Sequence, residues 1–293
     1  MKIALSNVAL ALGFIASASA FGVAHAASLV AINNTNQIGV LDSTNVSAAS
    51  FVNISGLNAG ESLIGIDLRP SNNTIYGIST GNNVYTVDAY SGAATFVTAL
   101  NLSIINPSLG YGFDFNPVAD FAGNPSLRLV SSAGNNYAVN VNTGVVGNAA
   151  SVIGNNYSAV AYTGSTPAGA PAATSLYYVD NSKDTLNVNV APGTFNAPNI
   201  QEIGKLGANI STANGFEILG DGSAFLAATI GGGNGLTRLF DVNLATGKAT
   251  QLGNFDSIIT GLAAAPSAVP VPAAAWLFGS ALIGFAGFRR KSI

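Results

Sequence analysis

Five copies of a short, strand-like motif recur along the sequence at intervals of 47, 47, 56 and 46 residues. The motif reads glycine, apolar residue, acid, apolar residue. Its copies begin at Gly65, Gly112, Ala159, Gly215 and Gly261, and those at Ala159 and Gly261 are degenerate. An interval of about 40–50 residues that holds several short strands is typical of the blades of a β-propeller. The spacing therefore predicts an all-β fold with five blades.

A second motif, in which a strand ends in a turn, alternates with the first. Its clear copies are residues 87–92, 139–144 and 242–247, and its weaker copies are residues 41–45 and 188–193. An Asp or Asn can accept backbone hydrogen bonds in the turn, and in most copies a final Gly supplies a positive φ. The first turn motif has no strand motif before it, and the last strand motif has no turn motif after it. We therefore predict that both termini of the domain close one blade, which removes an open sheet edge. A β-sandwich or β-solenoid is the alternative fold.

The N-terminus has the three parts of a secretory signal peptide. A lysine supplies the charge of the first stretch, an apolar run covers residues 8–15, and small residues lead to an A-x-A pattern at Ala24 and Ala26. This pattern predicts a signal helix within residues 1–26 and cleavage by signal peptidase after Ala26. The mature chain is then exported from the cytoplasm.

The C-terminus has the features of a short membrane anchor. Pro270 and Pro272 interrupt any preceding structure, residues 273–288 are apolar or small, and Arg289 and Arg290 begin a basic end. A helix over this apolar stretch is about 24 Å long, somewhat less than the ~30 Å hydrocarbon core of a bilayer. We predict a transmembrane helix at residues 273–288 with its basic end in the cytoplasm.

Residues 269–280 read Val-Pro-Val-Pro-Ala-Ala-Ala-Trp-Leu-Phe-Gly-Ser, and the apolar stretch and Arg-Arg-Lys follow them. This order resembles a PEP-CTERM sorting signal over segment 267–293, with Val271 where that signal carries its glutamate. The resemblance implies processing by an exosortase-type enzyme after transient anchoring in the membrane. It also implies delivery to the cell surface or extracellular matrix of a Gram-negative bacterium that makes exopolysaccharide. The processing residues would be Ala24, Ala26, Pro270, Pro272, Arg289 and Arg290.

The middle of the chain carries a second resemblance. Gly-Phe-Asp-Phe-Asn-Pro at residues 112–117, Leu-Arg-Leu-Val-Ser at residues 127–131 and the turn at residues 140–144 are similar to an uncharacterised bacterial family. That family is a domain of unknown function with propeller-like repeats that often occurs beside PEP-CTERM tails. The resemblance covers most of the domain at residues 27–266. It implies the propeller fold and no particular activity.

Composition removes several classes of function. Between the two ends, six basic and thirteen acidic residues remain, a formal charge of −7. Such a domain is a poor partner for nucleic acid. The sequence has no cysteine, and its one histidine, His25, leaves with the signal peptide. Thiolate and imidazole catalysis and His-ligated metals are therefore excluded. We predict no catalytic residue, no cofactor and no enzymatic activity.

One position of the strand motif is a candidate metal site. Its five copies hold Asp67, Asp114, Ala161, Glu217 and Ala263. If the motif strand is the innermost strand of each blade, Asp67, Asp114 and Glu217 could converge on a central channel and bind Ca²⁺, which takes oxygen ligands. Alternatively, each acid caps its own hairpin turn, since Pro70 and Pro117 follow three residues after two of them. The two alanines argue against a complete ring of ligands.

Three arginines and seven tyrosines are further candidates. Arg69, Arg128 and Arg238 could grip an acidic sugar, but surface charges or partners of nearby acids are the simpler interpretation. The tyrosines could stack on sugars, although aromatic residues at strand spacing more often form the core between blades. They are Tyr76, Tyr85, Tyr111, Tyr137, Tyr157, Tyr177 and Tyr178.

These features together favour an exported protein of the cell surface or extracellular matrix with a non-enzymatic binding role. Its partners would be exopolysaccharide or other surface proteins, and the membrane through the C-terminal helix. A purely structural coat component without a specific ligand is a second hypothesis. The enzymatic alternative is a lactonase-like or lyase-like propeller that uses carboxylates and Ca²⁺.

Overall fold

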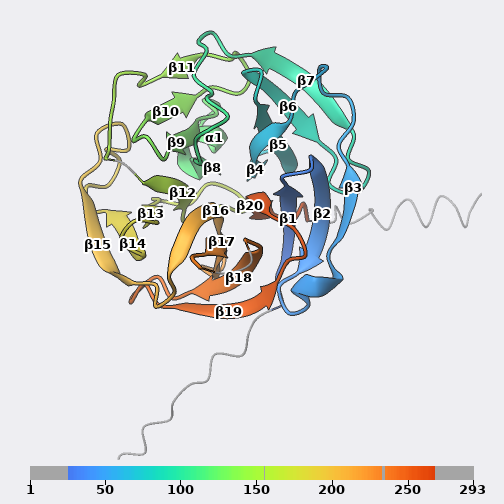
Figure 1. Cartoon of the computed structure of the whole chain (residues 1–293). Helices are drawn as coiled ribbons and strands as arrows, with labels where there is room; N and C mark the ends of the chain where they lie inside the picture. Colours follow the sequence, from blue (N-terminus) through green and yellow to red (C-terminus); the bar gives the residue numbers. More distant parts are fainter. Residues whose placement is uncertain (1–25, 155, 233–234, 268–293) are drawn as a thin grey trace, which may run out of the picture.

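The structure is a computed structural model that describes residues 26–154, 156–232 and 235–267. Five four-stranded antiparallel sheets stand around a central axis as the blades of a propeller (Figure 1). The predicted all-β, five-bladed fold is therefore confirmed, and the β-sandwich and β-solenoid alternatives are wrong. Helical structure in the described residues is limited to a 3₁₀ turn at Val46–Ala48 and the short helix α1 (Pro117–Phe121).

Each blade runs from an inner strand beside the axis to an outer strand at the rim (Figure 1). Blade 1 contains β4 (Leu63–Arg69), β5 (Thr74–Ser79), β6 (Asn83–Val87) and β7 (Ala94–Ala99). Blade 2 contains β8 (Tyr111–Phe115), β9 (Leu127–Ser131), β10 (Asn136–Val139) and β11 (Val146–Gly147). Blade 3 contains β12 (Tyr157–Tyr162), β13 (Leu176–Asp180), β14 (Thr185–Asn189) and β15 (Ile200–Lys205). Blade 4 contains β16 (Ile210–Ile218), β17 (Ala224–Ile230), β18 (Thr237–Val242) and β19 (Ala249–Asn254).

The fifth blade is assembled from both ends of the domain. Its inner strand is β20 (Ile259–Ala264), and its other strands are β1 (Ser28–Asn33), β2 (Gln37–Asp42) and β3 (Ser50–Asn53). Strands β20 and β1 pair antiparallel, with Leu29 opposite Ala264 and Ile32 opposite Gly261. The predicted closure by both termini is therefore confirmed. It covers the sheet edge that an open ring of blades would leave.

All five strand motifs lie on innermost strands, namely β4, β8, β12, β16 and β20. Each of these strands contacts the inner strands on both sides. The glycine of the motif permits this approach. A Cβ at Gly65 would lie 2.6 Å from the ring of Phe113, and one at Gly112 would lie 2.8 Å from the Cα of Ala159. A side chain at either position would push neighbouring blades apart, which explains the repeated glycine.

The turn motif also has the expected chemistry. Asp88 Oδ1 accepts hydrogen bonds from the backbone N–H groups of Tyr90 (3.1 Å) and Ser91 (2.7 Å), and Gly92 has φ +73°. Asn140 and Asn243 accept equivalent bonds in their own turns. Local hydrogen bonding therefore ends the third strand of these blades and directs the chain to the rim.

Most of the candidate tyrosines are buried in the core, within blades or between them. Tyr85 and Tyr178 are fully buried, and Tyr76, Tyr111 and Tyr137 nearly so. Tyr76 meets Phe115 of the next blade edge-to-face, with ring centroids 5.6 Å apart. The core interpretation of these tyrosines is therefore correct.

The predicted terminal segments fall largely outside the described residues. This applies to the signal helix, the transmembrane helix at residues 273–288, and the processing residues Ala24, Pro270, Pro272, Arg289 and Arg290. Ala26, the first described residue, is exposed. Among residues whose structure is described, no helix has the length and apolar character needed to cross a membrane.

Candidate functional site

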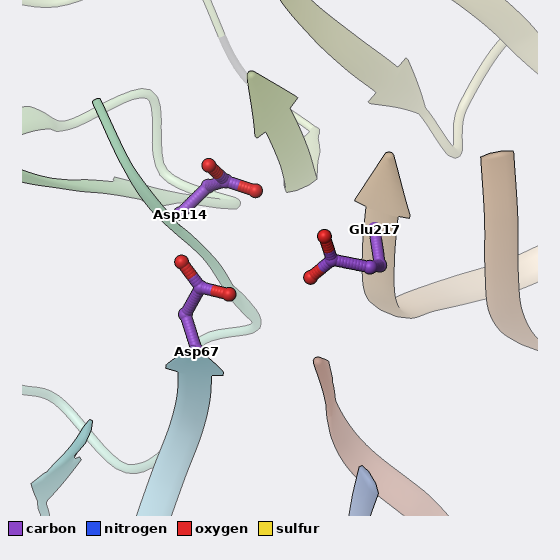
Figure 2. A group of neighbouring side chains, drawn as sticks. All are labelled: Asp67, Asp114 and Glu217. Carbon is purple, nitrogen blue, oxygen red and sulfur yellow. The ribbon is translucent and has the colours of Figure 1, made fainter. Parts of the chain in front are cut away.

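Three carboxylates from three different blades meet near the axis of the propeller. Asp67 on β4, Asp114 on β8 and Glu217 on β16 point toward one another (Figure 2). One oxygen from each lies within 4.8 Å of the others. The side chains are almost completely enclosed, with exposed fractions of 3%, 1% and 2%. Their common place in the motif brings them together, because the motif strands surround one axis.

The hydrogen bonds of the cluster leave several oxygens unused. Asp67 accepts bonds of 2.7 Å from the backbone N–H groups of Leu68 and Phe115, and the second bond crosses to blade 2. Backbone N–H groups on the next inner strands favour the ionised forms of the other two acids. The N–H of Tyr162 favours ionised Asp114, and the N–H of Ala264 favours ionised Glu217. The Tyr162 amide does not reach hydrogen-bonding geometry, and both oxygens of Asp114 and Oε2 of Glu217 have no partner in the described structure. Asp67 thus bonds to its own and the neighbouring strand rather than to the turn after β4.

Burial dominates the electrostatics of the cluster. Enclosure raises the pKa of Asp67 well above its ordinary value, and the charge of Glu217 raises it further. Burial and then the charges of Asp67 and Glu217 do the same to the pKa of Asp114. Burial raises the pKa of Glu217 to about 7. Hydrogen bonding to the Asp67 side chain and to the Ala264 amide opposes this rise. Without a counter-charge, the cluster therefore keeps protons at neutral pH.

No basic side chain of the described residues offsets this charge. The two ion pairs of the described residues join Arg69 to Asp120 and Lys183 to Asp180, and neither includes a carboxylate of the cluster. At the equivalent position of the other two inner strands, Ala161 and Ala263 are fully buried. The centre therefore combines three oxygen-bearing side chains with two small apolar ones, a set that could hold a hard metal ion.

Two of the three candidate arginines are buried. Arg69 Nε donates to Asp120 Oδ1 at 2.7 Å, and its Nη1 donates to Asn142 at 2.9 Å. Arg69 is therefore the partner of an acid, as one interpretation held. Arg238 donates to Gln251 at the exposed rim.

The surface-charge interpretation is wrong for Arg128, which is 3% exposed. Its guanidinium donates to Asn136 Oδ1 (3.0 Å), to Asn196 Oδ1 (2.9 Å) and to the carbonyl of Tyr137 (3.2 Å). Arg128 thus joins blade 2 to the loop between β14 and β15 of blade 3 through neutral acceptors. It offers no free charge to an acidic sugar.

A pocket of about 420 Å³ opens where the inner strands begin, at the opposite end of these strands from the carboxylates. Its lining contains no charged residue. The apolar part consists of Leu63, Ile64, Pro107, Leu109, Gly110, Tyr111 and Ile258. The polar part consists of Asn33, Asn34, Ser62, Thr80, Ser108, Thr212 and Thr260.

One wall of the pocket is a long loop between blades 1 and 2 that is fixed in place. Asn82 Oδ1 accepts from the N–H groups of Ile104 (2.7 Å) and Ile105 (2.9 Å), and the hydroxyl of Tyr111 accepts from Asn106 N–H (2.8 Å). The sequence analysis did not predict this pocket. Its one signal is the connection at residues 100–110, which is two residues longer than those at residues 54–62 and 148–156.

Comparison with known proteins identifies the family. The family described as "Domain of unknown function (DUF4394)" matches residues 37–263, from the start of β2 almost to the end of β20. The chain belongs to the DUF4394 family. The predicted resemblance of the middle of the chain to a family of unknown function is thereby confirmed, while the PEP-CTERM resemblance concerns residues outside this match.

Solved structures show distant likenesses to this DUF4394 chain. A protein of unknown function from Bacteroides caccae is 10% identical, with a TM-score of 0.38, over 83% of this chain and 100% of that one. The calcium-binding protein regucalcin from Agrobacterium tumefaciens is 15% identical, with a TM-score of 0.39, over 76% of this chain and 68% of that one. PorZ, a surface component of the type-IX secretion system of Porphyromonas gingivalis, is 14% identical, with a TM-score of 0.38, over 76% of this chain and 28% of that one. No curated protein matches the sequence. Likenesses at these scores carry no argument about what this chain binds.

Proposed function

We propose that this chain is an exported protein of the cell surface or extracellular matrix that binds its partner without catalysis. The pocket at the start of the inner strands is the binding site, and uncharged sugar units of exopolysaccharide are its ligand. The observation that carries this proposal is a preformed cavity of about 420 Å³ whose lining is wholly uncharged. Small-molecule sites commonly have 300–1,000 Å³, an apolar lining and a few placed polar groups.

The distribution of titratable groups supports binding over catalysis. General acid–base chemistry needs an ionisable group within hydrogen-bond reach of the substrate, and no acid or base lines the pocket. The carboxylates of Asp67, Asp114 and Glu217 are enclosed, so a substrate has no contact with them. This enclosure disfavours the lactonase-like or lyase-like alternative.

The direction of the chain is compatible with surface display. Strand β20 begins beside the pocket and runs toward the opposite end of the propeller. There Ser267 is held by Asn73 in the turn after β4, through bonds of 3.0 and 2.9 Å. The C-terminal segment therefore leaves from the end remote from the pocket. If that segment anchors the protein, the pocket faces away from the membrane.

Binding can be tested with oligosaccharides from neutral exopolysaccharide and two matched variants. Ile258 lines the pocket and is 37% exposed, and Val118 on α1 is also 37% exposed but lies outside it. We expect Ile258→Arg to weaken binding at least about tenfold, because it places an unpaired charge in the site, and Val118→Arg to leave binding unchanged. No binding at millimolar sugar, or equal binding by both variants, would overturn the proposal.

Export and processing need a separate measurement. Mass spectrometry of the protein from membrane, surface and medium fractions should show a new N-terminus at Ala27 and loss of the residues after the Val-Pro-Val-Pro segment. Such a product would support signal peptidase and exosortase-type processing. A membrane-bound peptide that ends at Ile293 would contradict release to the matrix.

A further inference from the structure

We infer that Asp67, Asp114 and Glu217 form a buried Ca²⁺ site that joins blades 1, 2 and 4 at the centre of the propeller. This site is separate from the sugar-binding pocket and does not depend on that proposal. Figure 2 shows the three carboxylates aimed at one point. The inference rests on their separation, on oxygens that lack partners, and on the chemistry of the surrounding groups.

The separation of the carboxylates suits a shared Ca²⁺ ion. Ca²⁺ binds oxygens at about 2.3–2.6 Å, so two oxygens on opposite sides of one ion lie about 4.6–5.2 Å apart. One oxygen from each of the three side chains lies within 4.8 Å of the others. All three can therefore contact one ion without a movement of the blades that carry them.

Unpartnered oxygens are the second, independent observation. Asp114 is 1% exposed, and neither of its oxygens has a hydrogen-bond partner in the described structure. Oε2 of Glu217 is likewise buried without a hydrogen-bond partner in the described structure. A buried polar atom without a partner is costly, and a buried charge without a partner is more so. A cation satisfies all three oxygens at once, whereas Asp67 is already oriented by the amides of Leu68 and Phe115.

The chemistry of the donors favours Ca²⁺ over other common ions. Among the described residues, the candidate ligands at this centre are three carboxylates, and no histidine or cysteine is present to offer a softer metal a ligand. Mg²⁺ releases its water reluctantly and demands near-ideal octahedral geometry, which conflicts with an enclosed site of three carboxylates. Ca²⁺ accepts both oxygens of one carboxylate and an irregular ligand number. Bidentate Asp114 and Glu217 with one oxygen of Asp67 would supply five ligands.

The two alanines explain why only three blades take part. Five acids around the axis would concentrate more negative charge than one divalent ion can balance. With Ala161 and Ala263 at the remaining positions, the fully ionised site carries −3, and Ca²⁺ reduces this to −1. The enclosure of the site indicates that the ion stabilises the fold rather than contacting a substrate.

Thermal unfolding of the mature protein with EDTA, Ca²⁺ or Mg²⁺ tests the inference. We expect Ca²⁺ to raise Tm and titration calorimetry to find one site, with Mg²⁺ much less effective. Asp114→Asn should weaken Ca²⁺ binding at least about tenfold, since it removes a ligand charge. Asp256→Asn, which changes an exposed acid outside the cluster, should bind as the wild type does.

Several outcomes would overturn the inference. One is a Tm that stays unchanged up to about 10 mM Ca²⁺, a concentration well above the range of weak extracellular sites. The others are equal Ca²⁺ binding by Asp114→Asn and wild type, and a larger increase in Tm with Mg²⁺ than with Ca²⁺. If Asp114→Asn does not fold, Glu217→Gln replaces it. Native mass spectrometry of the wild type then counts the bound ions, and one Ca²⁺ per chain that EDTA removes is the expected result. A wild type that carries none after dialysis against Ca²⁺ contradicts the site.

Discussion

Buried charge is handled in two different ways on the same inner strand. Arg69 and Asp67 both lie near the end of β4, two residues apart. Arg69 pairs with Asp120 at 2.7 Å, and the other oxygen of Asp120 accepts from the N–H of Ser71 at 2.9 Å. Asp67 instead faces Asp114 and Glu217, two further acids. The first site contains its own counter-charge, and the second does not.

Both sites connect blade 1 to blade 2, so the difference lies in where the compensating charge comes from. Asp120 is supplied by α1, which Asn116 begins by accepting a bond from Ala119 N–H at 3.1 Å. The helical turn α1 thus supplies the carboxylate that neutralises Arg69. Nothing comparable reaches the carboxylate cluster in the described residues. Stability of the first site should therefore be independent of added ions, and stability of the second should depend on them.

The largest effect is expected from breaking the self-contained pair. Asp120→Ala leaves Arg69 buried without its partner, and such a loss typically costs about 3–5 kcal/mol of unfolding free energy. Urea unfolding should show the same loss with EDTA and with Ca²⁺. Asp256→Ala is the control and should change stability little. A loss for Asp120→Ala that disappears when Ca²⁺ is added would contradict the division between the two sites.

A smaller effect should appear in the pH dependence of the metal-free protein. The pKa of Glu217 is about 7 in the folded state, against 4.5 for the ordinary side chain. Between these values the folded state holds a proton that the unfolded state has released, so stability falls as pH rises. The loss attributable to Glu217 is complete above pH 7 and is at most about 3 kcal/mol, at 1.36 kcal/mol per pKa unit.

Urea unfolding in EDTA near pH 5 and pH 7.5 measures this loss. Glu217→Gln removes the titrating group and should make the stability less dependent on pH, while Glu202→Gln, on the exposed face of β15, should not. Equal pH profiles for wild type and Glu217→Gln would show that the cluster does not titrate as described.

The smallest effect is expected from Asp114→Asn in the metal-free protein. Because burial raises the pKa of Asp114, the wild type must take up a proton there on folding near pH 7.5, and the change removes that cost. An unsatisfied buried group costs about 1–3 kcal/mol. We expect a gain of about 1 kcal/mol near pH 7.5 in EDTA, because the new amide also needs partners. In Ca²⁺ the sign should reverse. A variant less stable than wild type under both conditions would mean that Asp114 has a favourable partner in the protein itself.

The repeat predicted more of the fold than of the site. Motif spacing correctly predicted the blade number and the closure by both ends, because each blade repeats the same local chemistry. It also identified Asp67, Asp114 and Glu217 as equivalent positions, although turn capping was the favoured interpretation of them. Their convergence depends on the inward direction of three strands, which spacing alone does not give.

Features that break the repeat were not predictable. Arg69 and Asp120 are 51 residues apart and belong to different blades. Arg128 is buried among neutral acceptors that include Asn196, 68 residues away. The pocket combines the starts of several strands with the loop between β7 and β8. Such contacts depend on three-dimensional packing, and a periodic pattern carries no information about them.

The closing blade also has a consequence for the order of folding. Strand β1 is made first, but its inner partner β20 lies at the far end of the domain, with Leu29 opposite Ala264. Contacts of such long sequence separation form slowly, because the chain pays the entropy of closing the loop before it gains the pairing. During synthesis β1 therefore remains with one edge exposed, and chaperone binding to that edge would protect the nascent chain from aggregation.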